Sequence, residues 1–227
     1  AHEIKNPLSG IRGSAQLLSN KLDNRDLKEY TDIVIKQTDR LTALVDNILG
    51  PNKKPDFQYQ NIHYPIENVL KLIENESGYK SIKIVKDFDP SIPDLWIDSY
   101  LIENGILNLI KNARDALIDS NSINPQISVT TRIAYGEMID GERNSTVCKI
   151  SIIDNGPGIR DDIKDSIFFP MITGKDKGTG LGLSITQGII SQHNGNIHFS
   201  SEPNRTEFFV NIPINTDKAL DLHIANG

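Results

Sequence analysis

Two glycine-rich stretches decide the fold of this chain: Asp154-Asn155-Gly156-Pro157-Gly158-Ile159 and Gly178-Thr179-Gly180-Leu181-Gly182-Leu183. The first follows an alternating apolar run, residues 147–153, which predicts a strand. The second opens a helical pattern, and its glycines let the backbone approach a ligand closely. A helix N-terminus offers unpaired N–H groups and positive partial charge to phosphates, and Asp154 can accept a hydrogen bond from an adenine amino group. Together the two stretches predict a nucleotide site.

A third informative stretch lies upstream, where residues 99–119 show an amphipathic helical pattern. Asn108 and Asn112 stand four positions apart and therefore share one face of the predicted helix. Two neutral oxygen donors suit a Mg²⁺ ion that keeps several waters and binds mainly through nucleotide phosphates. The alternative is a polar groove without metal. Because the two glycine stretches accompany this helix, we favour the metal–nucleotide role, with Asn112 as the metal ligand.

These residues resemble a known family, the sensor histidine kinases. Four stretches look like the N, G1, F and G2 boxes of that family: Asn112, Asp154-x-Gly156-x-Gly158, Phe168-Phe169-Pro170 and residues 178–183. The first eight residues, Ala1-His2-Glu3-Ile4-Lys5-Asn6-Pro7-Leu8, are similar to the H box, which holds the phosphorylated histidine. The likeness extends to about Ile214. Details in residues 49–51, 169–175 and 205–208 resemble the nitrogen-regulation kinases of the NtrB family.

The resemblance implies ATP-dependent autophosphorylation of a histidine, transfer to a response regulator and dephosphorylation of that regulator. The implied cofactors are ATP and Mg²⁺. The implied partners are the receiver domain of a response regulator, a second copy of the chain as a homodimer, and a P-II-type regulatory protein. Nucleotide contacts are expected at Asn108, Asn112, Asp154, Gly156, Gly158, Lys175, Gly178, Thr179, Gly180, Leu181, Gly182 and Thr206. For Lys175, a solvated lysine is the competing interpretation.

Residues 1–50 carry two apolar heptad seams, which predict two helices. The first seam is Ile4, Leu8, Ile11, Ala15, Leu18 and Leu22; the second is Leu27, Tyr30, Val34, Gln37, Leu41, Leu44 and Ile48. Asp26 is the expected cap of the second helix, and Gly50-Pro51 is expected to end it. A two-helix hairpin cannot bury its seam alone, whereas two copies can do so in a four-helix bundle. Dimerisation is therefore a physical expectation, and the resemblance implies it too.

The predicted catalytic residues lie at the start of the first helix. His2 and Asn6 fall on the side opposite the seam, toward solvent. A neutral imidazole nitrogen of His2 can attack a γ-phosphoryl group, while Glu3 holds the other ring nitrogen and stabilises the developing charge. The resemblance links Asn6 to regulator dephosphorylation, where an amide can orient an attacking water. An ordinary exposed histidine and a solvated asparagine are the competing interpretations.

Residues 56–215 show an α+β pattern after a short linker at residues 51–55. Strands are predicted at residues 57–61, 82–88, 94–97, 126–135, 146–153, 196–201 and 206–213, and helices around residues 66–73, 99–119 and 182–193. Helices on one face of a mixed sheet make a two-layer sandwich, and the resemblance implies the ATP-binding fold of histidine kinases, gyrase and Hsp90. Residues 136–145 are predicted to be a polar hairpin tip, residues 160–181 a mobile lid, and residues 216–227 a poorly ordered tail.

Composition limits the classes of protein to which this chain can belong. The 227 residues carry a net charge of −6 without a basic cluster, which argues against nucleic-acid binding. The single cysteine, Cys148, permits no internal disulfide and fits a reducing cytoplasm. No apolar run approaches the ~18 residues of a membrane span, and no signal peptide is present. The chain begins Ala1-His2, so we interpret it as a fragment from which an upstream sensor region has been removed.

Two other functions remain open from the sequence. One is an ATP-hydrolysing machine of the gyrase or Hsp90 kind, which places a glutamate one turn before the metal-binding asparagine to activate water. That position is Asn108 here, and an amide is not a general base. The other is a degenerate kinase that binds nucleotide and acts as a scaffold or phosphatase. The presence of His2, Asn112, Asp154 and both glycine stretches argues against it.

Overall fold

The computed structural model describes residues 2–22, 24–48, 55–74, 76–120, 122–139, 142–143, 146–174 and 179–214. Within these ranges, the side chains of residues 2–5, 25–26, 40, 43–48, 77 and 142–143 are outside the description. The chain divides into two compact units, Ala1–Lys54 and Pro55–Gly227, and each is described by itself.

The first unit is a helical hairpin of α1 (His2–Lys21) and α2 (Arg25–Ile48). Asn24 caps α2, because its Oδ1 accepts the N–H of Leu27 at 3.4 Å. The prediction that Asp26 caps this helix is therefore wrong, and Asp26 lies in the first turn instead. The predicted stop at Gly50-Pro51 lies outside the described residues.

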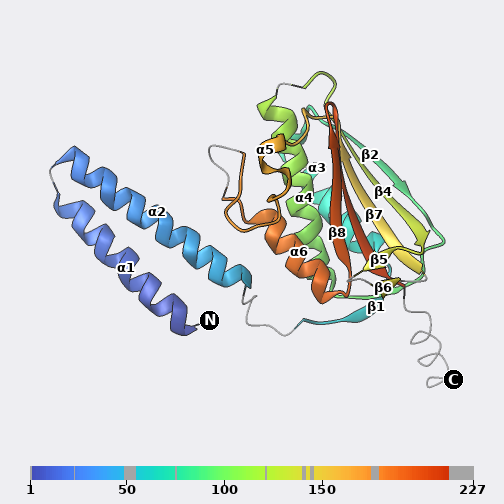
Figure 1. The fold of residues 1–227 in the computed structure, drawn as a ribbon, viewed down its shortest axis with the longest axis horizontal. Helices are drawn as coiled ribbons and strands as arrows, with labels where there is room; N and C mark the ends of the chain where they lie inside the picture. Colours follow the sequence, from blue (N-terminus) through green and yellow to red (C-terminus); the bar gives the residue numbers. More distant parts are fainter. Residues whose placement is uncertain are drawn as a thin grey trace. The chain divides into compact units, whose positions relative to one another are not determined.

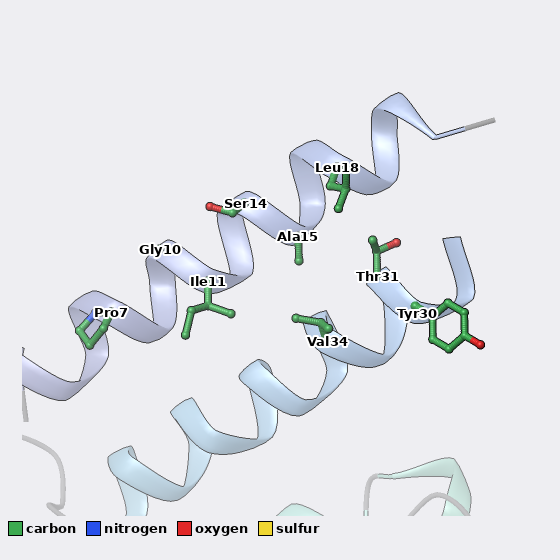
Figure 2. Close-up of a pocket in the computed structure, with 9 residues that line it drawn as sticks. All are labelled: Pro7, Gly10, Ile11, Ser14, Ala15, Leu18, Tyr30, Thr31 and Val34. Atoms are coloured by element: carbon green, nitrogen blue, oxygen red, sulfur yellow. The ribbon is translucent and has the colours of Figure 1, made fainter. Parts of the chain in front are cut away.

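Within one hairpin the helices meet through small side chains. Ala15, Thr31 and Thr38 are buried, and each threonine hydroxyl donates to a carbonyl of its own helix, Lys28 O or Val34 O, at 2.7 Å. The larger seam residues stay 42–67% exposed: Ile11, Leu18, Leu27, Tyr30, Val34 and Leu41. Several of them line an apolar groove of about 590 Å³ between the helices, drawn in Figure 2. A single hairpin therefore leaves most of the described side chains of its apolar seam accessible.

The second unit contains a five-stranded sheet in the order β2-β4-β7-β9-β8. These strands are β2 (Lys83–Phe88), β4 (Gln126–Tyr135), β7 (Thr146–Asp154), β8 (Asn196–Glu202) and β9 (Arg205–Pro213). The β2–β4 pair is parallel and the other pairs are antiparallel. Buried and less buried positions alternate along β4, as expected for a sheet with one covered face.

Three helices cover one face of this sheet, as Figure 1 shows: α3 (His63–Glu74), α4 (Ser99–Asp119) and α6 (Gly182–Gln192). Their buried isoleucines and leucines form one core with the inner face of the sheet. This second unit is the predicted two-layer sandwich, and the α+β class is confirmed.

Short elements complete the second unit. β1 (Gln58–Gln60) pairs with β3 (Leu95–Ile97), and η1 (Ser77–Tyr79) and α5 (Asp161–Lys164) are single turns. In the described part of the predicted hairpin tip, β5 (Met138–Ile139) pairs with β6 (Glu142–Arg143), and Ile139 is buried. Among the described residues, no helix is both long and apolar enough to cross a membrane.

Candidate nucleotide-binding site

Asp154 forms the floor of the site at the end of β7. It is only 4% exposed and lies between Ile127 of β4 and Thr206 of β9 in the sheet register. Its Oδ1 accepts the N–H of Gly156 at 2.9 Å. A Cβ at Gly156 would lie 2.7 Å from this oxygen, so only glycine allows the chain to turn so tightly around the carboxylate. The first glycine stretch therefore fixes the orientation of a buried hydrogen-bond acceptor.

The rest of the first glycine stretch is anchored to β8 and β9. The N–H of Ile159 donates to Ser201 Oγ at 2.8 Å, and Ser201 Oγ lies 3.3 Å from Thr206 Oγ1. Gly158 lies close to the Glu202 carbonyl, 2.9 Å from where its Cβ would be. The sequence did not predict Ser201 as part of the site. Its hydroxyl links the glycine loop to the predicted contact residue Thr206.

Asn155 anchors the same loop on its other side. Its Oδ1 accepts the N–H of Gln126 at 2.8 Å, and its Nδ2 donates to Asn124 O at 3.0 Å. Sequence reasoning gave Asn155 no role, because Asn124 and Gln126 come within reach of its side chain only when β4 and β7 pair. The loop after Asp154 is thus held at both ends by side-chain hydrogen bonds.

One face of α4 forms the wall of the site. Asn108 and Asn112 are half-buried and lie against the first residue of α6, since a Cβ at Gly182 would be 3.9 Å from Asn108 Cγ and from Asn112 Nδ2. One turn further along, Ala116 Cβ lies 3.5 Å from the Cβ position of Gly156. The amide pair therefore faces the second glycine stretch, and the next turn of α4 reaches the first.

The first turn of α6 closes the site opposite α4. Leu181 occupies its N-cap position, and no side chain among the described residues caps this helix end. Such an end presents backbone N–H groups to an anion. The preceding Gly180 has φ +69, and a Cβ there would lie 2.5 Å from the Met171 backbone. Its carbonyl accepts the N–H of Met171 at 2.9 Å, which joins the second glycine stretch to the segment after Phe168-Phe169-Pro170.

Comparison with known families supports this geometry. Residues 97–216, which include β7, β9, α4 and α6, match the family of histidine kinase-, DNA gyrase B-, and HSP90-like ATPases. The chain belongs to this ATPase family. Residues 1–54 match a second family, the His Kinase A (phospho-acceptor) domain. The resemblance to sensor histidine kinases drawn from the sequence is confirmed.

Individual relatives narrow the likeness. The chain is 46% identical over 214 residues to the sensory histidine kinase/phosphatase NtrB of Vibrio alginolyticus and 44% identical to the protein of that name from Escherichia coli O157:H7. Each alignment covers 94% of this chain and 60% of the relative. The chain therefore spans less than two thirds of the length of these relatives.

Solved structures show the same fold. The catalytic domain of the histidine kinase ThkA is 29% identical, with a TM-score of 0.57 over 70% of this chain and 95% of that domain. ThkA in complex with the response regulator protein TrrA is 28% identical, with a TM-score of 0.59 over 96% of this chain and 60% of that one. Full-length ShkA in complex with AMPPNP, 23% identical over 93% of this chain and 44% of that one, has a TM-score of 0.59 and supports the fold alone.

The ATPase-family site brings most of the predicted nucleotide residues together: Asn108, Asn112, Asp154, Gly156, Gly158, Gly180, Leu181, Gly182 and Thr206. Leu181 is 3% exposed, so its backbone rather than its side chain can face a ligand. Thr179 is exposed beside this group. Lys175 and Gly178 lie outside the described residues. Phe168 packs against Phe199, with ring centroids 6.1 Å apart, whereas Phe169 is 64% exposed.

The predicted catalytic residues lie in the other unit. His2, Glu3 and Asn6 belong to α1; Asn6 is exposed, and the side chains of His2 and Glu3 are outside the description. Within the described residues, no cluster of three histidine, cysteine or acidic side chains could hold a metal. Cys148 is a fully buried core residue, and this burial raises the pKa of its thiol to about 12.

Proposed function

We propose that this chain is the kinase core of a two-component sensor, which phosphorylates its own His2 with ATP and passes the phosphoryl group to an aspartate of a response regulator. One observation carries the proposal: the start of α6, which no side chain in the described ranges caps, the amide pair of α4 and the buried Asp154 converge on one site. That combination suits the phosphates, the metal and the adenine of Mg·ATP, respectively.

The chain's own groups divide the binding of ATP between them. Asp154 would accept the adenine amino group, with Thr206 beside it on β9. The N–H groups at the start of α6 would receive the phosphates. Asn112, with Asn108 one turn before it, supplies the neutral oxygens that fit a hydrated Mg²⁺ ion. When bound, this ion neutralises charge on the phosphates and so favours nucleophilic attack on them.

The phosphoryl acceptor in this proposal is His2. Glu3 would hold the imidazole in one tautomer and stabilise the positive charge that develops as the nitrogen attacks. Asn6, exposed one turn further along α1, would orient water during dephosphorylation of the regulator. Asn6→Ala should then slow regulator dephosphorylation and spare self-labelling, whereas Glu3→Gln should do the reverse. Equal loss of both activities in both variants would point to damage of the helix instead.

The partners follow from the same proposal. The regulator would present its receiver domain to α1, and the similar kinase ThkA has been solved in complex with a response regulator protein, TrrA. A second copy of this chain would cover the exposed apolar seam of the hairpin. The named relatives favour nitrogen regulation, and a P-II-type protein is the proposed input. The site is expected to work on cytoplasmic ATP.

The test is incubation with γ-labelled ATP and Mg²⁺. The protein should take up label that survives base and is lost in acid, as a phosphohistidine does, and His2→Gln should take up none while binding nucleotide normally. ATP hydrolysis without labelling would favour the gyrase-like alternative, although Asn108 lacks the basicity to activate water. Nucleotide binding with neither labelling nor hydrolysis would indicate a degenerate kinase.

A further inference from the structure

His193, at the C-terminal end of α6, is a buried histidine outside the nucleotide site. Its Nε2 lies 3.1 Å from the backbone N of Asp98, and its Nδ1 lies 2.8 Å from Ile189 O. Because a backbone N–H only donates and a carbonyl only accepts, the ring must be neutral with its proton on Nδ1. Burial lowers the pKa of His193 and so favours this neutral form.

The two hydrogen bonds join the two helices that form the nucleotide site. Ile189 belongs to α6, and Asp98 caps α4 by accepting the N–H of Leu101 at 3.0 Å. The two helices are antiparallel and extend side by side from this end to the site. Along them, Gly105 lies against Thr186, and Gly182 lies against the amides Asn108 and Asn112. The imidazole therefore fixes the far end of the helix pair whose near end holds the phosphates.

The same network reaches the segment that follows the interdomain linker. The Asp98 carboxylate also accepts the N–H of Asp56 at 2.7 Å. The Phe57 ring lies 4.9 Å from the His193 ring and stacks on Trp96 at 6.3 Å. Trp96 is the only tryptophan of the chain. Its fluorescence therefore reports on this junction without any added label.

We propose that His193 is a positioning residue for the phosphate half of the nucleotide site. By joining α6 to α4 and to residues 56–57, it sets the register between the start of α6 and the amides of α4. It also couples nucleotide occupancy to the segment that leads to the hairpin. This inference rests on the proposed ATP site and adds a residue that contacts neither ATP nor metal.

The test compares two replacements of His193 in the whole chain by calorimetry. His193→Phe keeps a ring against Phe57 and loses both hydrogen bonds; it should bind Mg·ATP about tenfold more weakly. Adenosine, which the Asp154 side of the site would hold, should change by less than about twofold. His193→Gln retains one donor and one acceptor and should restore Mg·ATP affinity. His198→Phe, on the exposed face of β8, is the matched control and should bind both ligands normally.

Every result of this calorimetry either supports or overturns the positioning role of His193. Equal weakening of adenosine and Mg·ATP in His193→Phe, unchanged Mg·ATP affinity, or no rescue by glutamine would overturn the positioning role. A wild-type chain that binds no Mg·ATP would instead overturn the proposed function itself. If His193→Phe does not fold, amide exchange in the wild type replaces it. Bound Mg·ATP should then slow exchange of the Asp98 N–H, and an unchanged rate would contradict the proposal.

Trp96 gives an independent readout of the coupling. Saturating Mg·ATP should shift Trp96 emission in the wild type and in His193→Gln, because both keep hydrogen bonds from position 193 to Asp98 N–H and Ile189 O, and Asp98 in turn holds Asp56 next to Phe57 and Trp96. At saturation, His193→Phe should show no shift. A shift of equal size in all three proteins would mean that the junction responds to nucleotide by another route.

Discussion

The sandwich and the hairpin differ in how completely one chain can build them. The sandwich buries its own core, and the loop after Asp154 is held by backbone N–H groups that donate to the side chains of Asn155, Ser201 and Asp154. In the hairpin, the two helices contact each other through Ala15, Thr31 and Thr38, and their larger apolar residues remain exposed. One chain can therefore preform the proposed nucleotide site, whereas the helix that carries the proposed phosphoacceptor His2 would need a second copy to cover its apolar residues.

Breaking the hairpin seam should have the largest effect. Val34→Asp places a charge on the exposed apolar stripe, and burying it in a dimer interface should weaken dimerisation by more than about a hundredfold. Nucleotide binding by the sandwich should not change. Lys36→Asp, on the opposite side of α2, is the control and should remain dimeric. Sedimentation of a wild-type monomer, or of a Val34→Asp dimer, would remove the contrast between the two units.

Removing the charge at the floor of the nucleotide site should have the second-largest effect. Asp154→Asn keeps the size of the side chain but replaces a charged acceptor. Hydrogen bonds to charged groups contribute roughly 1.5–3 kcal/mol, so ATP affinity should fall by about ten- to a hundredfold. Asp161→Asn, an exposed carboxylate on α5, should have no effect. Calorimetric titration that finds equal affinity in both variants would place adenine elsewhere.

A smaller loss is expected from filling the tight turn after Asp154. Gly156→Ala would put a Cβ 2.7 Å from Asp154 Oδ1 and force the carboxylate or the loop to move. Overpacking of this kind costs about 1–3 kcal/mol, so ATP should bind roughly tenfold more weakly. Gly188→Ala on α6 has open space around the new methyl group and serves as control. Thermal melting of both variants would show whether the loss stays local.

Lowering the pH should have the smallest effect, and it should reduce the stability of the sandwich. Burial is the main cause that lowers the folded-state pKa of His63 and His193 below the ordinary value of 6.5. The contribution of these neutral histidines to the free energy of unfolding is therefore fully present above pH 6.5. It falls as the pH drops from there toward the folded-state pKa values, because over this range the unfolded chain binds protons more readily than the folded one. Denaturant titrations at pH 7.5 and 5.5 should show this loss, and His193→Gln should show less of it. An equal pH dependence in both proteins would exclude His193 as a contributor.

Local patterns predicted most of the sandwich because its strands and helices follow simple periodicities. Alternation placed β4 and β7, and the apolar face of α4 placed that helix from Ser99 to Asp119. The same spacing put Asn108 and Asn112 on one face, where the structure finds them.

The residues that escaped prediction depend on contacts distant in sequence or on the choice between similar neighbours. Ser201 matters only because the β8–β9 register brings it to Thr206. The contacts of His193 could not be predicted from the sequence, since its partner Asp98 is 95 positions away. Asn24 and Asp26 are both good cap types, and only the path of the hairpin turn chose Asn24.

Mapping the phosphorylated residue tests the central claim most directly. The chain is incubated with Mg·ATP, digested at neutral pH, and its phosphopeptides are identified by mass spectrometry. We expect a single phosphoryl group on His2, absent from His2→Gln and strongly reduced in Asp154→Asn at limiting ATP. Phosphate on any other residue, or undiminished phosphorylation in either variant, would contradict the assignment of His2 as the phosphoryl acceptor of this ATP site.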